Sequence, residues 1–157
     1  MFNKKYLRTL IFVGLSIGFL VVAFFVIDKF SYRKNRYFKE DEIAEISIGG
    51  NFFQAEIATT PAKRSQGLSG RKDLCESCAM LFVFNEKGMH SFWMKKMKFN
   101  LDIIWIDKNE IVYIVKKVSK KKEFEIIKPE HEADKILEIN AGLTDKLGIK
   151  IGDKVKF

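Results

Sequence analysis

The stretch AMLFVFNEKGMHSFWMKKMKFNLDIIWID, residues 79–107, decides how this chain folds. Two apolar runs, Ala79–Phe84 and Leu101–Ile106, flank a segment that places Trp93 beside Lys95. Short apolar runs bounded by turn residues are typical of buried strands. The two runs therefore predict core strands, and the segment between them contains a candidate ligand-binding surface.

Strand and turn signals continue on both sides of this stretch. A Gly-Gly-Asn turn at 49–51 joins two extended runs and predicts a β-hairpin over residues 43–58. Thr60 and Pro61 are typical of a helix start, and Gly67 can end that helix. The other expected elements are strands at 89–94, 111–118, 135–140 and 154–157, and one or two helical turns at 141–148. These many short strands predict an α+β, mostly β domain, a compact antiparallel barrel-like sheet with two short helices.

The first 42 residues have a different composition from the rest of the chain. Residues 1–8 form a basic tail, and residues 9–27 contain no charged side chain. About 20 apolar residues span a hydrocarbon core, so residues 9–27 predict one transmembrane helix. No small-x-small site follows this run, which favours an uncleaved anchor over a cleaved signal peptide. Residues 28–42 predict a juxtamembrane linker, and residues 43–157 predict one β-rich soluble domain.

The net charge of +8 is shared between these two parts. Residues 1–42 hold 8 Lys/Arg against 4 Asp/Glu, and residues 43–157 hold 20 against 16. The soluble domain is therefore only modestly basic, and no nucleic-acid partner is predicted. Basic residues flank the anchor on both sides, so the positive-inside rule does not decide its orientation.

Cys75 and Cys78 form the only cysteine pair in the sequence. In an oxidising compartment a C-x-x-C loop can close as a disulfide, and otherwise the thiols stay free. A thioredoxin-like redox site needs its first cysteine at a helix N-terminus after a strand, whereas this pair precedes a strand. Only His90 and His131 could complete a zinc site, and their spacing does not indicate one. We therefore expect no metal and no cofactor, and the sequence also lacks P-loop, dinucleotide and G-x-S-x-G motifs.

Two acidic residues occupy positions among apolar strand residues. Strand alternation puts Asp102 on the face of Ile104, and Glu138 on the face of Ile136. An acid in such a position must be hydrogen-bonded, paired with a cation or placed at the edge of a cleft. One interpretation is that Arg71, Asp102 and Glu138 form a polar network that fixes strand register.

The alternative interpretation is a shallow pocket lined by Trp93. A tryptophan next to a lysine suits stacking on a sugar ring or binding of a carboxylate, although a tryptophan on a strand is more often part of the core. Two carboxylates could also perform glycosidase-type acid–base chemistry. No catalytic residue is assigned. The candidate ligand-binding residues are Arg71, Trp93, Lys95, Asp102, Glu138 and Asn140.

Six motifs, in order, resemble the Domain of Unknown Function 192 family. They are QGLSGRKDL (66–74), MLFVF (80–84), SFWMKK (91–96), LDIIWID (101–107), LEINAG (137–142) and LGIKIGDKV (147–155). The resemblance covers roughly residues 50–157. It implies a compact β-rich domain in prokaryotic membrane or exported proteins, often behind a signal peptide or a single anchor, and it implies no established activity.

This chain departs from the family pattern in a few places. Ala79, Lys96 and Asn100 stand where the family often has glycine, asparagine and proline. The loop that holds the two cysteines is often cysteine-free in the family. These departures bear on any binding role for the segment from Trp93 to Asp102.

Taken together, the sequence predicts a single-pass protein of a prokaryotic cytoplasmic membrane, with its soluble domain outside the cytoplasm. The cysteine pair and the family resemblance decide this orientation. The expected function is a membrane-anchored, extracytoplasmic binding or interaction domain for a cell-envelope carbohydrate or protein, and catalysis is not favoured. The alternative is a small envelope hydrolase that uses Asp102 and Glu138.

Overall fold

The structure is a computed structural model that describes residues 38–157, and these residues form one compact unit. The predicted tail at 1–8 and the predicted anchor at 9–27 lie outside the described residues. Neither helix of the described region has the length and apolar character needed to cross a membrane. The elements are β1 (Ile43–Ile48), β2 (Asn51–Ala58), α2 (Pro61–Gln66), β3 (Cys78–Gly88), β4 (Phe92–Trp93), β5 (Leu101–Asp107), β6 (Glu110–Val118), β7 (Ile126–Ile127), β8 (Ala133–Asn140), α3 (Leu143–Lys146) and β9 (Val155–Lys156).

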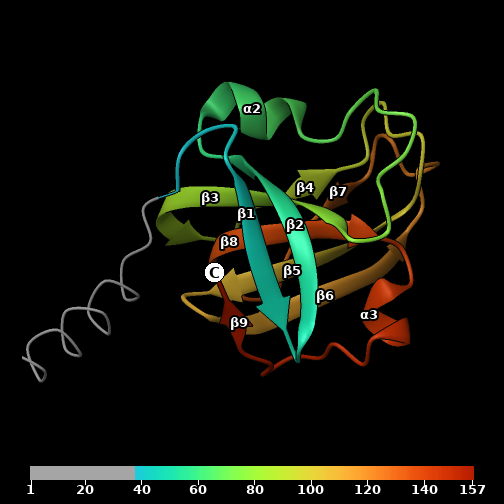
Figure 1. The fold of residues 1–157 in the computed structure, drawn as a ribbon. Coiled ribbons are helices and arrows are strands. Elements are labelled where there is room, and N and C mark those ends of the chain that lie inside the picture. The colour runs from blue at the N-terminus through green and yellow to red at the C-terminus, as the bar shows by residue number, and fades with distance from the viewer. Residues whose placement is uncertain (1–37) are drawn as a thin grey trace, which may run out of the picture. The chain divides into compact units, whose positions relative to one another are not determined.

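Seven of the strands form one sheet in the order β6-β5-β8-β3-β2-β1-β9, and the sheet curls into a half-barrel (Figure 1). β4 and β7 form a separate two-stranded antiparallel ribbon. The predicted mostly β fold with two short helices is confirmed. The sheet is not purely antiparallel, because β2 and β3 run parallel. A parallel pair needs a crossover, and the segment at 59–77 with α2 supplies it.

The predicted hairpin at 43–58 is confirmed by the pairing of β1 with β2. Ile48 pairs with Asn51, which leaves a two-residue loop at Gly49 and Gly50. Both glycines have positive φ, 57° and 85°. Two-residue hairpin loops favour such angles, which cost glycine little because it has no Cβ.

β3 is longer than predicted. The sequence predicts that this strand stops at Phe84, whereas it continues to Gly88 and pairs there with Ala133. The turn that Asn85–Gly88 suggests in the sequence does not form, and the register of β3 against β8 instead shifts between Val83 and Gly88. The chain reverses later, and the strand predicted at 89–94 shortens to the two residues of β4.

The two faces of the sheet each cover a hydrophobic cluster. On β5, Ile104 and Ile106 belong to one cluster, and Ile103 and Trp105 belong to the other. The predicted alternation along this strand is confirmed. Because both faces of β5 are buried, a polar residue on either face needs its own partners or an opening to solvent.

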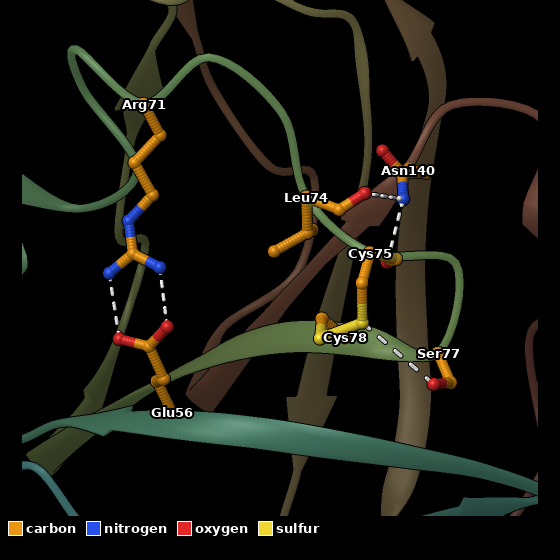
Figure 2. Close-up of a disulfide and its surroundings, with 7 residues drawn as sticks. All are labelled: Glu56, Arg71, Leu74, Cys75, Ser77, Cys78 and Asn140. Atoms are coloured by element: carbon orange, nitrogen blue, oxygen red, sulfur yellow. Dashed lines mark hydrogen bonds and ion pairs between the residues drawn. A yellow bond between two sulfur atoms is a disulfide. The ribbon is translucent and has the colours of Figure 1, made fainter.

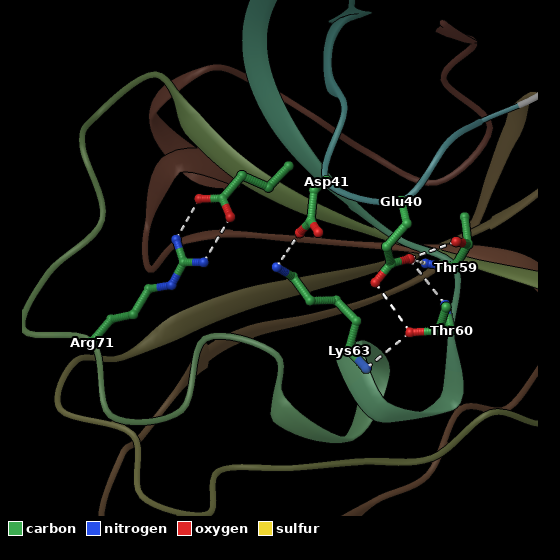
Figure 3. Close-up of polar contacts among 7 residues, drawn as sticks. Glu40, Asp41, Thr59, Thr60, Lys63 and Arg71 are labelled. Carbon is green, nitrogen blue, oxygen red and sulfur yellow. Dashed lines mark hydrogen bonds and ion pairs between the residues drawn. The ribbon is translucent and has the colours of Figure 1, made fainter.

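Residues 38–42 are fastened to the start of α2 (Figure 3). The Glu40 carboxylate accepts hydrogen bonds from the backbone N–H and the hydroxyl group of both Thr59 and Thr60. Thr60 in turn accepts from the N–H of Lys63 and caps α2, as predicted, with Pro61 at the first position of the helix. This arrangement fixes the position of α2 against the end of β2.

Candidate functional site

A pocket of about 240 Å³ lies between α2 with its following loop and the segment that carries β4. Its apolar lining comes from Leu68, Phe82, Phe84, Phe92, Trp93 and Met97. Serine hydroxyls contribute to the lining from both walls. The lining combines six apolar side chains with six polar ones, and small-molecule sites also combine apolar surface with placed polar groups.

Two local features hold the walls of this pocket together. Gly67 ends α2 with a φ of 51°, and a Cβ added there would lie 3.3 Å from the Phe82 ring. Any larger residue would therefore strain the backbone and crowd the ring. Across the gap, the Ser69 hydroxyl donates to the Lys95 carbonyl at 2.8 Å, and the N–H of Gly70 donates to the Lys96 carbonyl at 3.0 Å.

Trp93 forms part of one wall and keeps 48% of its surface exposed. Its neighbours in sequence point inward: Met94 is fully buried, and the Phe92 ring meets the Phe82 ring edge-on at 4.8 Å. The Lys95 ammonium lies 4.9 Å from the centre of the Trp93 ring. Trp93 is therefore not a core residue, and its ring borders both the pocket and solvent.

Glu138 lines the pocket from the sheet and is only 4% exposed. It lies on β8 between Met80 of β3 and Ile103 of β5, so its strand neighbours are apolar. Within residues 38–157, its carboxyl group makes no hydrogen bond and no ion pair. Burial disfavours the ionised form and raises the pKa of Glu138 to about 8.

Asp102 lies on the opposite face of the sheet, because it pairs with Ile139 rather than with Glu138. It is fully buried, and its carboxylate accepts four hydrogen bonds. The donors are the backbone N–H groups of Lys117, Gly142 and Thr144, at 2.7–3.0 Å, and the Thr144 hydroxyl at 2.7 Å. Asp102 therefore joins the end of β6 to the start of α3 and does not line the pocket.

Arg71 pairs with Glu56 of β2 in a two-pronged contact, with 2.7 Å between Nη2 and Oε2 (Figure 2). The hydrogen bond from Arg71 is the main cause that lowers the pKa of Glu56. The structure thus does not assemble the predicted network of Arg71, Asp102 and Glu138. The register explains this, because Glu56 and Glu138 lie on either side of Met80 and Arg71 reaches only the nearer acid.

Asn140 holds the loop that precedes β3. Its amide group donates to the carbonyls of Leu74 and Cys75, at 2.9 and 3.0 Å (Figure 2). Cys75 and Cys78 in that loop are joined by a disulfide. Asn140 therefore supports the disulfide loop and lies outside the lining of the pocket.

Among the candidate residues, the structure thus brings Trp93 and Glu138 to one pocket, and Lys95 lies over the Trp93 ring without lining the pocket. Asp102 and Glu138, the two acids of the hydrolase alternative, face opposite sides of the sheet. In the described part of the chain, no group of three or more His, Cys, Asp or Glu side chains could hold a metal ion.

Sequence reasoning missed the α2 side of the pocket. Arg64 and Leu68, four residues apart, both line it. Leu68 lies beyond the end of α2 at Gly67, so helical spacing does not relate the two residues and no local pattern pointed to a shared surface. The aromatic residues on β3, Phe82 and Phe84, were expected only as core.

Comparison with known proteins extends the resemblance seen in the sequence. A crystal structure of a protein of unknown function from Novosphingobium aromaticivorans DSM 12444 is similar, with 32% identity and a TM-score of 0.70 over 73% of this chain and 85% of that one. A Sinorhizobium meliloti 1021 protein, described as a "putative transcription regulator", has 25% identity and a TM-score of 0.71 over 76% of this chain and 97% of that one.

No functionally curated protein matches this chain significantly. The model of the Domain of Unknown Function 192 (DUF192) family, described as "Uncharacterized ACR", matches residues 44–157. The match covers more than two thirds of the chain and includes every strand of the half-barrel. The chain therefore belongs to the DUF192 family.

Proposed function

We propose that this protein is a membrane-anchored binding domain that presents its pocket to the cell envelope, and that the pocket takes a carbohydrate. The observation that carries the proposal is the combination of a half-exposed Trp93 and a buried, unpaired Glu138 in one pocket of the described region. The tryptophan offers a flat apolar face to a sugar ring, and the carboxyl offers a hydrogen-bonding group to its hydroxyls.

Binding is favoured over hydrolysis by the positions of the two buried acids. Glycosidase chemistry needs two carboxyl groups that flank the same bond, roughly 5–10 Å apart. Here the Asp102 carboxylate faces away from the pocket and already accepts four hydrogen bonds. Glu138 is the one acid that lines the pocket.

An envelope location is supported by two features of the chain. The apolar run at 9–27 predicts a membrane anchor. The disulfide between Cys75 and Cys78 is of the kind that persists in oxidising compartments. The proposal therefore places the pocket outside the cytoplasm, where envelope glycans occur.

Binding can be tested by calorimetric titration of the full-length protein in detergent with a panel of envelope-type mono- and oligosaccharides. Replacing Trp93 by alanine removes the stacking face, and we expect the affinity to fall at least about tenfold, because stacking on an aromatic ring typically contributes 1–3 kcal/mol. Phe124→Ala is the matched control, since Phe124 is 92% exposed and lies outside the pocket. Equal affinities for the Trp93→Ala variant and the unaltered protein would contradict the proposal.

Orientation is tested separately by adding a protease to intact cells that express the full-length protein. Cleavage of the domain without permeabilisation is the expected result. Protection in intact cells, followed by cleavage after permeabilisation, would place the domain in the cytoplasm and remove the envelope part of the proposal.

A further inference from the structure

The pocket holds two ionisable side chains, Arg64 and Glu138, and they do not pair with each other in the described region. Arg64 comes from α2, and Glu138 comes from the sheet. The other lining residues are apolar, small or uncharged polar. The charge of the pocket therefore depends on the protonation of these two groups.

Arg64 is positioned by the protein and keeps part of its hydrogen-bonding capacity. Its Nη1 donates to the carbonyl of Val83 at 3.0 Å and to the carbonyl of Thr59, and its guanidinium lies 4.6 Å from the centre of the Phe84 ring. Within residues 38–157, its Nη2 and Nε make no hydrogen bond. A guanidinium stays charged at every ordinary pH, so these groups are fixed cationic donors.

Glu138 meets no cation from the elements packed around it. Its partners on β3 and β5 are Met80 and Ile103, and Asp102 of β5 faces the other side of the sheet. A buried carboxyl without a counter-charge favours its neutral form, in which it is an O–H donor.

The remaining charged groups nearby are engaged elsewhere. Arg71 is paired with Glu56, and the backbones at Glu56 and Glu138 are two strand spacings, roughly 10 Å, apart. His90 stacks on Phe84 with 3.6 Å between ring centres, and Lys95 lies over Trp93. At neutral pH the pocket therefore contains the positive charge of Arg64 and the uncharged carboxyl group of Glu138.

From this arrangement we infer that the ligand is an acidic sugar, a uronic-acid type in which the ring carries a carboxylate. This inference rests on the proposed carbohydrate-binding function and adds the charge of the ligand. The sugar ring lies against Trp93, its carboxylate meets Arg64, and the Glu138 carboxyl donates a hydrogen bond to an oxygen of the ligand. Lys95 adds positive charge over the face of the Trp93 ring.

Two other ligand classes fit this pocket less well. An amino sugar would bring a cation next to Arg64 and would need Glu138 to ionise in a buried position. A neutral sugar would offer the cationic donors of Arg64 only uncharged hydroxyl acceptors. Charge-assisted hydrogen bonds are roughly twice as strong as neutral ones, which favours the acidic ligand.

The test compares glucuronate, methyl glucoside and glucosamine by calorimetric titration of the full-length protein in detergent. At about pH 6 we expect glucuronate to bind at least about tenfold more tightly than either competitor. At about pH 9.5, where Glu138 is ionised and repels the carboxylate, we expect glucuronate affinity to fall at least about fivefold.

Three variants separate the roles of the two groups. Glu138→Gln keeps an uncharged donor, so glucuronate binding should persist and should lose its dependence on pH. Arg64→Lys keeps the charge and should keep the preference for glucuronate, whereas Arg64→Gln should lose it. Lys63→Gln is the matched control, because Lys63 is the adjacent cation on α2 and pairs with Asp41 outside the pocket (Figure 3).

Two outcomes would overturn the inference and leave carbohydrate binding intact. Equal affinities for glucuronate and methyl glucoside would show that charge is not recognised. If glucosamine bound most tightly and its affinity rose as Glu138 ionised, the result would show that the Glu138 carboxylate binds the amino group of the ligand. If none of the sugars binds, the proposed function fails, and this inference fails with it.

Discussion

The two faces of the half-barrel each bury an acidic side chain, but only one face supplies it with hydrogen-bond donors. On one face, Asp102 is fully buried and accepts four hydrogen bonds from two separate segments of the chain. On the other face, Glu138 is 4% exposed, lines a pocket and has no partner among residues 38–157. The two residues lie on adjacent, directly paired strands.

The difference shows that burial alone does not reveal what an acid does. A buried carboxylate that is fully hydrogen-bonded connects the segments that supply its donors, and removing it leaves those donors unsatisfied. Burial disfavours the ionisation of a carboxyl group that has no hydrogen-bond partner, and such a group is available to bind a ligand. We therefore assign Asp102 to the fold and Glu138 to the pocket.

The largest effect on stability is expected for Asp102→Ala. The substitution leaves four donors without their acceptor, two of them on Thr144, and we expect the free energy of unfolding to fall by about 3–5 kcal/mol. Urea unfolding followed by circular dichroism measures this loss. Thr144→Val removes one of the four bonds and should cost about 1 kcal/mol. A loss below about 1 kcal/mol for Asp102→Ala would mean that its hydrogen bonds do not stabilise the fold.

The second effect is a fall of stability with rising pH that comes from the raised pKa of Glu138. Its pKa is near 4.5 in the unfolded chain and about 8 in the folded domain, so the folded state binds more protons between these values. The free energy of unfolding should therefore fall as pH rises from about 4.5 to 8, and this loss should be complete above the folded pKa.

Glu138→Gln should remove that pH dependence. We expect the variant to gain about 4 kcal/mol relative to the unaltered protein between about pH 5 and 9, because its side chain does not titrate. Urea unfolding at several pH values measures the difference. If the free energies of unfolding of the two proteins changed with pH in parallel, the pKa of Glu138 would not be raised by burial. Glu138 and Asp102 would then no longer differ in the way proposed.

A smaller effect is expected from the disulfide. Joint replacement of Cys75 and Cys78 by serine opens a four-residue loop, for which chain entropy predicts a loss of about 2 kcal/mol. Asn140 still holds the loop through two carbonyls, so the pH dependence due to Glu138 should persist. Unfolding curves with and without reductant measure both quantities. A changed pH dependence would show that this loop also shapes the surroundings of Glu138.

The smallest effect is expected for Arg71→Gln. The pair with Glu56 is about one third exposed on both sides, and such pairs typically contribute less than about 1 kcal/mol. Met80 separates this pair from Glu138, so the variant should keep the same loss of stability with rising pH. If that pH dependence changed, Arg71 would be acting on Glu138 across two strands, and the charge assigned to the pocket would need revision.

The parts of the fold that could be predicted depend on local chemistry. The Gly49–Gly50 hairpin and the Thr60-Pro61 helix start follow from short-range preferences of the backbone. Alternation correctly separated the two faces of β5 and β8. The strands predicted at 101–106, 111–118, 135–140 and 154–157 appear with boundaries within two residues of those expected, whereas those predicted at 79–84 and 89–94 do not.

The partners of the charged residues could not be predicted, because they depend on contacts distant in sequence. Asp102 receives backbone donors from segments 15 and 40 or more residues further along the chain. Arg71 pairs with Glu56 because the parallel pairing of β2 with β3 brings that acid within reach. Parallel pairing across a crossover leaves no local pattern in the sequence. The α2 wall of the pocket is missing from the sequence-based site for the same reason.

If residues 9–27 form the proposed membrane anchor, the attachment of Glu40 to the start of α2 sets an upper limit on the length of the linker between anchor and domain. Twelve residues, 28–39, separate the predicted anchor at 9–27 from Glu40. A fully extended chain spans at most about 3.5 Å per residue, so these residues reach about 40 Å. The last residues of α2, Arg64–Gln66, line the pocket. Under the proposed function, so short a linker would keep the pocket close to the lipid surface and would raise the effective concentration of ligands that lie there.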